Sequence, residues 1–256
     1  MKKSLGQNFL TSVGAINKII ASSDYSPGLT ILEVGPGRGV LTEALLKKFD
    51  KVVAVEKDHE LISVLQDKFS KEITSGQLQL IEGDILELTP TELNLANYAI
   101  VANIPYYITG QFLRVWLQNK PKYMVLMVQK EVAKRIVASD KKESLLSISV
   151  KLYGEPKYIE TIKRGSFYPI PNVDSAILKI TLNLETKSPS ELDEERFFAL
   201  LKAGFAHKRK LLLNNLKETN VSDIQKGFTN CNITPNIRAE DLTVENWVCL
   251  VKSTKR

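Results

Sequence analysis

The stretch TILEVGPGRG, residues 30–39, decides the fold. Its first half, Thr30 to Val34, is a short β-branched and apolar run that is typical of a buried strand. Glycines follow at positions 35, 37 and 39, and apolar residues recur at helical spacing from Leu41 onward. A strand, a glycine-rich turn and a helix in this order let a ligand approach the backbone closely where the strand ends.

The alternation of short apolar runs and helical patterns continues along the chain. It predicts parallel strands joined by helical crossovers, the α/β class with a Rossmann-like sheet. Further strands are expected in KVVAVE (51–56), LQLIEGD (78–84), YAIVAN (98–103) and YMVLMV (123–128), after a first helix capped by Ser12. Residues 144–153 fit either a helix or a strand, and we favour a helix. Residues 157–163 and 175–182 indicate two more strands.

A change in composition near Lys187 indicates a domain boundary. The segment NLETKSPSELDEE (183–195) is polar and acidic, and the patterns beyond it are helical. We therefore expect an α/β domain over residues 1–186 and a small all-helical domain over residues 187–256.

Charge and composition restrict the class of protein only loosely. The formal net charge of +6 permits a polyanionic partner without requiring one. Cys231 and Cys249 match no metal-ligand spacing, so we expect no metal and two reduced thiols in a cytoplasmic protein. No run is apolar for long enough to cross a bilayer, and no signal peptide is expected.

The glycine loop favours one nucleotide cofactor over another. A dinucleotide-binding turn has the spacing GxGxxG, whereas this chain has GxGxG, with Glu33 two residues before Gly35. Glu56 ends the second strand, where an acid suits ribose hydroxyls, and Asp84 follows the third, where it suits an adenine amine. Acids after three successive strands favour S-adenosylmethionine over NAD. The alternative is that all three are ordinary turn residues.

The motif NIPY, residues 103–106, follows the fourth strand and suits methylation of a base amine. The lone pair of an adenine amine is delocalised into the ring, so the nitrogen needs two acceptors that draw it toward sp³ geometry. The side-chain oxygen of Asn103 is one acceptor, and the carbonyl of Ile104, extended because Pro105 follows, is the other. Tyr106 offers a flat face on which an extruded base stacks.

These motifs together resemble a known family. The segments LGQNFL (5–10), LEVGPGRGVLT (32–42), VEKD (55–58), GDIL (83–86), NIPYYIT (103–109), QKEVAKRIVA (129–138), FYPIPNVDSA (167–176) and FAHKRKLLLNNL (205–216) stand in the order seen in KsgA-type rRNA adenine dimethyltransferases. The resemblance returns weakly at RAEDLT (238–243). It implies dimethylation of two adjacent adenosines in the 3′-terminal hairpin loop of 16S rRNA, within the small ribosomal subunit or its precursor.

The resemblance also implies the site residues. By matching motif positions, Asn8, Leu10, Gly35, Glu56, Asp84 and Asn103 would line the cofactor, and the spacing of the glycine loop adds Glu33, Gly37 and Gly39. The target base would be held by Asn103, Pro105 and Tyr106, with Phe167 on its other face. Tyr107 departs from the family, because many bacterial members have asparagine there. The related erythromycin-resistance methyltransferases of large-subunit rRNA differ at Asn8 and in the glycine loop.

Basic residues supply candidate RNA contacts. The run His207 to Lys210 is predicted to begin a helix, where the macrodipole disfavours cations, so Lys208, Arg209 and Lys210 are expected to bind phosphates. A solvated surface run is the alternative. We expect a monomer that does not contact a membrane. Two other functions remain open: a non-catalytic RNA-binding assembly factor on this fold, and an NAD-dependent oxidoreductase.

Overall fold

The computed structural model describes residues 8–138, 140–183, 193–217 and 223–254. The chain divides into two compact units, Met1–Ala133 with Glu155–Leu182, and Lys134–Gly154 with Asn183–Arg256. The expected boundary near Lys187 lies outside the described residues. Residues 134–154, which the sequence places with the α/β domain, belong to the second unit, because a helix in this segment packs against helices near the C-terminus.

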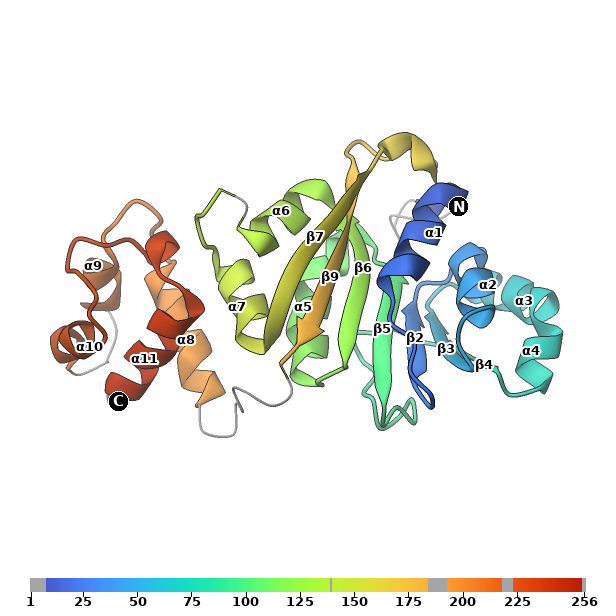
Figure 1. The fold of residues 1–256 in the computed structure, drawn as a ribbon, viewed down its shortest axis with the longest axis horizontal. Helices are drawn as coiled ribbons and strands as arrows, with labels where there is room; N and C mark the ends of the chain where they lie inside the picture. Colours follow the sequence, from blue (N-terminus) through green and yellow to red (C-terminus); the bar gives the residue numbers. More distant parts are fainter. Residues whose placement is uncertain (1–7, 139, 184–192, 218–222, 255–256) are drawn as a thin grey trace. The chain divides into compact units, whose positions relative to one another are not determined.

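The first unit is built on a seven-stranded sheet with the order β4-β3-β2-β5-β6-β9-β7 (Figure 1). Its strands are β2 (Thr30–Val34), β3 (Lys51–Glu56), β4 (Leu78–Glu82), β5 (Tyr98–Asn103), β6 (Tyr123–Gln129), β7 (Gly154–Ile162) and β9 (Ser175–Leu182). Strands β2 to β6 pair in parallel, whereas β9 runs antiparallel to β6. The Rossmann-like α/β prediction is confirmed, and so are all seven predicted strands.

Helices cover both faces of this sheet, with α5 on the opposite side from α1 and α2 (Figure 1). They are α1 (Val13–Ser22), α2 (Val40–Leu46), α3 (His59–Lys68), α4 (Ser70–Thr74) and α5 (Thr109–Gln118). Helix α6 (Lys130–Val137) begins in the first unit and ends in the second, and α7 (Leu145–Tyr153) belongs to the second unit. Apolar side chains of α1, α2 and α3 pack with alternate residues of the central strands in one core. Ser12 caps α1, and the ambiguous segment 144–153 is the helix α7, as expected.

A second, two-stranded sheet joins distant parts of the sequence. Strand β1 (Phe9–Leu10) pairs antiparallel with β8 (Phe167–Tyr168), so that Leu10 lies opposite Phe167. The side chain and backbone of Thr11 donate hydrogen bonds to the carbonyl of Ser166 at 3.0 and 2.8 Å. The segment QNFL and the segment FYPIP, which the sequence analysis treats separately, are therefore one structural element.

The C-terminal part of the second unit is helical, as predicted. Its helices are α8 (Glu194–Gly204), α9 (Leu212–Lys217), α10 (Ile224–Asn230) and α11 (Val244–Ser253). Helix α11 packs against α8 at Gly204, where a Cβ atom would come within 2.3 Å of the fully buried Trp247 ring. A side chain at position 204 would therefore separate these helices.

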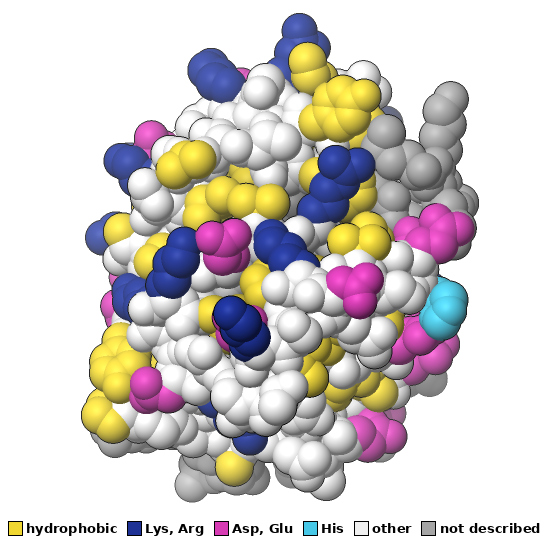
Figure 2. Space-filling model, turned by 90° about the vertical axis from the view of Figure 1, so that its right-hand side faces the viewer, with side chains coloured by type: hydrophobic (Ala, Val, Ile, Leu, Met, Phe, Trp, Pro, Cys, Tyr) yellow, Lys and Arg dark blue, Asp and Glu magenta, His cyan; other side chains and the backbone are white. Residues whose placement is uncertain are grey.

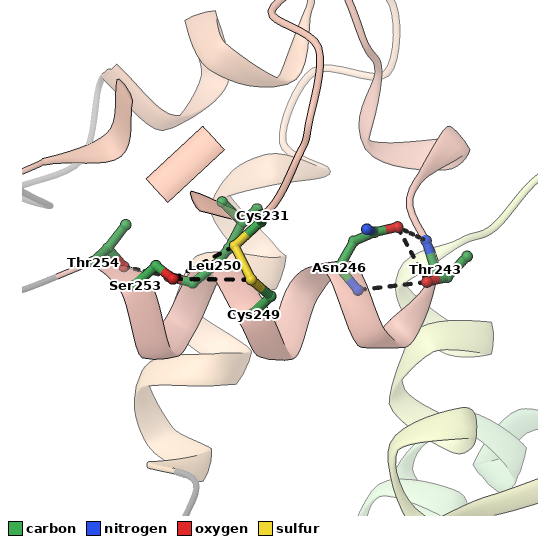
Figure 3. Close-up of a disulfide and its surroundings, with 7 residues drawn as sticks. All are labelled: Cys231, Thr243, Asn246, Cys249, Leu250, Ser253 and Thr254. Carbon is green, nitrogen blue, oxygen red and sulfur yellow. Dashed lines mark hydrogen bonds between the residues drawn. A yellow bond between two sulfur atoms is a disulfide. The ribbon is translucent and has the colours of Figure 1, made fainter. Parts of the chain in front are cut away.

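The expectation of two reduced thiols is wrong in this structure, because a disulfide joins Cys231 to Cys249 (Figure 3). Cys231 directly follows α10, and Cys249 lies on α11, which packs against α10. Their Cα atoms are 5.8 Å apart, within the span that a disulfide requires. The separation of 18 residues in the sequence conceals this proximity, since it depends on how the two helices pack.

Candidate active site

A cavity of about 790 Å³ lies at the carboxyl ends of the parallel strands. Ligands of open α/β sheets bind at this edge, because the loops that follow neighbouring strands meet there. All but one of the predicted cofactor and base contacts line the cavity: Asn8, Leu10, Glu33, Gly35, Gly37, Glu56, Asp84, Asn103, Pro105, Tyr106 and Phe167. Tyr107, where the chain departs from the family pattern, also lines it and is 61% exposed.

Gly39 is the exception, because it does not line this cavity. It precedes α2 with a φ of +71°, and a Cβ atom there would lie 2.4 Å from Cε2 of Phe69. The glycine is required by close packing against α3 and by a left-handed backbone. Gly39 therefore shapes the loop, and its assignment to the cofactor finds no support in the position of the residue.

The glycine loop is fixed in place by Glu56, the last residue of β3. The carboxylate of Glu56 accepts hydrogen bonds from the backbone N–H groups of Gly37 at 3.1 Å and of Lys57 and Asp58 at 2.9 Å each. Burial raises the pKa of Glu56, while these three donors oppose the rise. Carboxylate oxygens have further acceptor capacity, so Glu56 holds the loop and still faces the cavity as an acceptor.

Glu33, at the end of β2, is a buried acid with an unsatisfied oxygen. The residue is only 1% exposed, and no described residue donates a hydrogen bond to its Oε2 atom. Burial raises the pKa of Glu33 to about 8, with smaller opposing contributions from Thr42 and Lys68. A buried carboxyl oxygen without a hydrogen-bond donor is costly, and a cationic ligand in the cavity would supply the missing interaction.

Asp84 has an ion-pair partner that the sequence analysis did not identify. Its Oδ2 atom lies 2.6 Å from Nζ of Lys57, and its Oδ1 atom accepts from the backbone N–H of Leu86 at 3.0 Å. Burial would raise the pKa of Asp84, but these two bonds outweigh it, and the pKa is lowered. Lys57 directly follows Glu56, the last residue of β3, so its position at the cavity could have been predicted from the sequence.

Asn103 ends β5 with its side-chain amide held in one orientation. Its Nδ2 group donates to the backbone carbonyl of Asn8 at 3.3 Å. No described residue donates to its Oδ1 atom, so this oxygen is presented as an acceptor. The carbonyl of Ile104 likewise accepts no hydrogen bond from the described residues, while its N–H donates to Met127. Two acceptors on successive residues are therefore left for a ligand.

The aromatic residues of the motif are also positioned from outside it. The hydroxyl of Tyr106 forms a hydrogen bond of 2.7 Å with the hydroxyl of Ser175, a fully buried residue at the start of β9. Phe167 is 2% exposed and reaches the cavity from β8. Ser175 was not predicted to belong to the site, although it lies in the motif FYPIPNVDSA.

A family comparison now identifies the chain. The family described as "Ribosomal RNA adenine dimethylase" matches residues 1–256. The chain belongs to this family. It is an S-adenosylmethionine-dependent enzyme that methylates adenine in ribosomal RNA. Its similarity to "Ribosomal RNA small subunit methyltransferase A" is 46% identity for Dehalococcoides mccartyi strain BAV1, over 97% of this chain and 87% of that one. For the Fusobacterium nucleatum protein of the same name the identity is 38%, over 98% and 96%.

Solved structures agree with the fold. The 23S rRNA methyltransferase ErmE has a TM-score of 0.77 at 24% identity and covers 96% of this chain, with 99% of its own chain matched. A dimethyladenosine transferase from Plasmodium falciparum has a TM-score of 0.76 at 25% identity, over 94% of this chain and 95% of that one. Both matches extend over the two units, so the sheet and the C-terminal helices are common to these proteins.

The residues of the cavity fit S-adenosylmethionine. The cofactor carries a positive sulfonium and a positive ammonium, and the cavity contains the unsatisfied Glu33 carboxyl group. It also carries an adenosine, for which Glu56 and Asp84 offer acceptors at two successive strand ends. No cluster of three or more His, Cys, Asp or Glu side chains suited to a metal occurs among the described residues.

The basic run lies in a turn of the second unit. Residues 206–210 are exposed and stand between the end of α8 and the start of α9, so the prediction that they begin a helix is corrected. The run follows the C-terminus of α8, where cations are favoured, and precedes the N-terminus of α9, where they are disfavoured. The helix macrodipole therefore gives no argument for phosphate binding by this run. The buried Asn215 shapes the turn by donating to the carbonyls of Gly204 at 2.6 Å and His207 at 3.2 Å.

The face of the first unit that carries α3 and α4 has no comparable basic run among the residues that the structure describes. Lys and Arg side chains are interspersed there with Asp and Glu (Figure 2). Lys68 pairs with Glu43 at 3.6 Å, and His59 lies 2.9 Å from Glu82. Among the helices that the structure describes, none is both long and apolar enough to span a membrane.

Proposed function

We propose that this enzyme transfers methyl groups from S-adenosylmethionine to the N6 amines of two adjacent adenosines in the 3′-terminal hairpin loop of small-subunit rRNA. Relatives from Dehalococcoides mccartyi and Fusobacterium nucleatum carry the name of a small-subunit rRNA methyltransferase, which supports this choice of RNA. The observation that carries the chemistry is the fixed amide of Asn103, whose oxygen is left as an acceptor at the cavity.

The geometry supports catalysis by alignment. When bound, S-adenosylmethionine supplies a methyl group that its sulfonium already activates. Asn103 Oδ1 and the Ile104 carbonyl accept the two amine hydrogens of the target adenine and direct its nitrogen lone pair toward the methyl group. Tyr106 and Phe167 hold the extruded base between them, and Pro105 keeps the turn extended. Each transfer forms one N–CH3 bond as the methyl–sulfonium bond breaks, and the amine releases one proton to water. The singly methylated amine keeps one hydrogen, so one of the two acceptors and the aromatic pair position it for the second transfer.

We assign the cofactor site to Asn8, Leu10, Glu33, Gly35, Gly37, Glu56, Asp84 and Asn103, all of which line the cavity. Lys208, Arg209 and Lys210 contact rRNA phosphates from the second unit. The partner is 16S rRNA in the small subunit or its precursor, in the cytoplasm, and the enzyme acts as a monomer. The catalytic part extends to about residue 186, and the RNA-contacting helices follow it.

Mapping methylated adenosines tests this proposal. Total rRNA is compared between cells with the gene, cells without it, and cells that carry the Asn103→Ala variant. We expect dimethylation of two adjacent adenosines near the 3′ end of the small-subunit rRNA only in cells with the parent enzyme. Loss of a methyl group in large-subunit rRNA instead would favour methylation of 23S rRNA, the activity named for ErmE. Unchanged rRNA would exclude both.

A further inference from the structure

An exposed tyrosine stands next to the buried base-contacting phenylalanine. In β8, Phe167 is 2% exposed and Tyr168 is 59% exposed, since successive side chains of a strand point to opposite faces. Tyr168 nevertheless lines the same cavity. A large aromatic side chain at the edge of a binding cavity, exposed over more than half of its surface, is available for a ligand.

Tyr168 belongs to a cluster with an arginine. It lies opposite Phe9 in the antiparallel β1–β8 pair, which places both side chains on one face. The guanidinium of Arg38 lies 5.1 Å from the centroid of the Phe9 ring. Phe9 also contacts the glycine loop, because a Cβ atom on Gly37 would come within 3.0 Å of its ring. Phe9 thus connects Arg38 and Tyr168 to the glycine loop, and we call these three residues the Arg38–Phe9–Tyr168 cluster.

The charge of Arg38 is not neutralised within the described part of the chain. Two lysines of neighbouring segments have carboxylate partners, Lys57 with Asp84 and Lys68 with Glu43. Arg38 is exposed, and its guanidinium forms no ion pair with a described residue. A planar cation stacked on an aromatic ring, beside a second exposed ring, suits both the base and the phosphate of a nucleotide.

We propose that Arg38 and Tyr168, supported by Phe9, bind the nucleotide next to the target adenosine in single-stranded rRNA. The inference rests on the proposed function and adds a second nucleotide position to the same site. Tyr168 stacks on the neighbouring base, and Arg38 binds its phosphate. Phe167 and Tyr168 are consecutive residues on opposite faces of β8, so each of two consecutive bases has its own aromatic surface.

Kinetics on unmethylated small-subunit particles test the stacking. Tyr168→Ala is expected to raise the KM for particles by about 5- to 20-fold, in the range of one lost base-aromatic stack, and to change kcat less than 2-fold. Tyr168→Phe keeps the ring and is expected to behave as the parent. Tyr25→Ala is the matched control, because Tyr25 is exposed but outside the cavity lining. Equal KM values for Tyr168→Ala and Tyr25→Ala would overturn the proposal.

A change in the RNA identifies the base that is stacked. Particles are prepared in which each neighbour of the adenosine pair is set in turn to adenosine or uridine, because adenine stacks better than uracil. The parent enzyme is expected to prefer adenosine at one of the two positions by about 3-fold or more in kcat/KM. Tyr168→Ala should lose this preference. A preference that persists in the variant would show that another residue contacts the base.

The role of Arg38 is tested with one variant that removes its charge and one that keeps the charge on a group of different shape. Arg38→Gln is expected to reduce the slope of log KM against log salt by about one phosphate contact, whereas Arg38→Lys restores the slope. Arg114→Gln, an exposed arginine of α5 outside the cavity lining, is the control for net charge. Calorimetry with S-adenosylmethionine should give the parent's affinity for both Arg38 variants. A loss of cofactor affinity would assign Arg38 to the carboxylate of the cofactor and overturn its role here.

The two proposals fail in distinguishable ways. If the parent enzyme does not methylate small-subunit particles, the proposed function fails. If it does so and the Tyr168 and Arg38 variants match their controls, only the second nucleotide position fails.

Discussion

The strand ends of the first unit and the basic turn of the second unit are built in different ways. At the strand ends, single atoms have assigned partners, such as Glu56 with three backbone donors and Asn103 with the Asn8 carbonyl. In the turn, residues 206–210 are exposed, and Asn215 donates a hydrogen bond to the backbone carbonyl of His207. Methyl transfer depends on positions within a fraction of an ångström, whereas attraction to phosphate depends on total charge. Single substitutions should therefore matter at the strand ends, and only combined ones in the turn.

The largest effect is expected for Asn103→Ala. Loss of an oriented acceptor should lower kcat by about 100-fold or more, while the affinity for small-subunit particles remains that of the parent. Asn97→Ala is the control, since the Asn97 amide donates to the Gly28 carbonyl and lies outside the cavity lining. A near-parental rate for Asn103→Ala would remove the residue from catalysis.

Removal of the disulfide, which lies in the second unit, should lower stability without changing cofactor binding by the first unit. Replacing both Cys231 and Cys249 by serine opens a closed loop of 18 residues, which should lower the free energy of unfolding by about 3 kcal/mol. Cofactor affinity should not change, because the cavity is lined by residues of the first unit. A reductant should destabilise the parent and leave the double variant unaffected. If a reductant leaves the stability of the parent protein unchanged, the Cys231–Cys249 disulfide is contradicted.

Glu56→Ala should weaken cofactor binding by about 2 kcal/mol, because ribose hydroxyls lose an acceptor and the Gly37 N–H loses its partner. Isothermal calorimetry with S-adenosylmethionine measures the change. Glu155→Ala, an exposed acid of β7, controls for the loss of charge. Equal affinities for the two variants would exclude Glu56 from the cofactor site.

Glu33 predicts a dependence of stability on pH. Its pKa rises from an ordinary value of 4.5 to about 8 in the folded protein, so the native state holds the proton more tightly than the unfolded chain. The stabilisation is complete below pH 4.5 and is lost as the pH rises through 8. Between these limits Glu33→Gln should gain about 1–2 kcal/mol relative to the parent, measured by urea unfolding of the cofactor-free proteins. Parallel pH profiles would contradict the raised pKa.

The smallest effect per residue is expected in the basic turn. Replacing Lys208, Arg209 and Lys210 together by glutamine should weaken particle binding by about 1 kcal/mol and reduce its salt slope by up to about three contacts. The control replaces Lys202, Lys217 and Lys252, exposed residues of the same unit, with the same loss of charge. Equal salt slopes for the two triple variants would leave the turn as ordinary surface charge.

Local patterns predicted what depends on neighbours in sequence, and missed what depends on packing. Glu33, Glu56 and Asn103 end strands, so their convergence followed from the parallel sheet alone. The partners Ser175 and Asn8 lie far from Tyr106 and Asn103 in sequence, and only the fold brings them together. Gly39 belongs to the same motif as Gly37, but position 39 requires a glycine because it lies so close to the ring of Phe69. The Cys231–Cys249 bond required the packing of two helices that no local pattern specifies.

The β1–β8 pairing has a consequence for synthesis on the ribosome. Thr11 and its partner Ser166 are 155 positions apart, and Asn103 is oriented by a carbonyl from the same early segment. At about 5–20 residues per second, roughly 8–30 s pass between the emergence of β1 and that of β8. The glycine loop and its hydrogen bond to the Glu56 carboxylate can form much earlier. The nascent chain therefore completes its cofactor loop before its catalytic amide is held in place, and an arrested or truncated product lacking β8 would have a cofactor loop without an ordered catalytic centre.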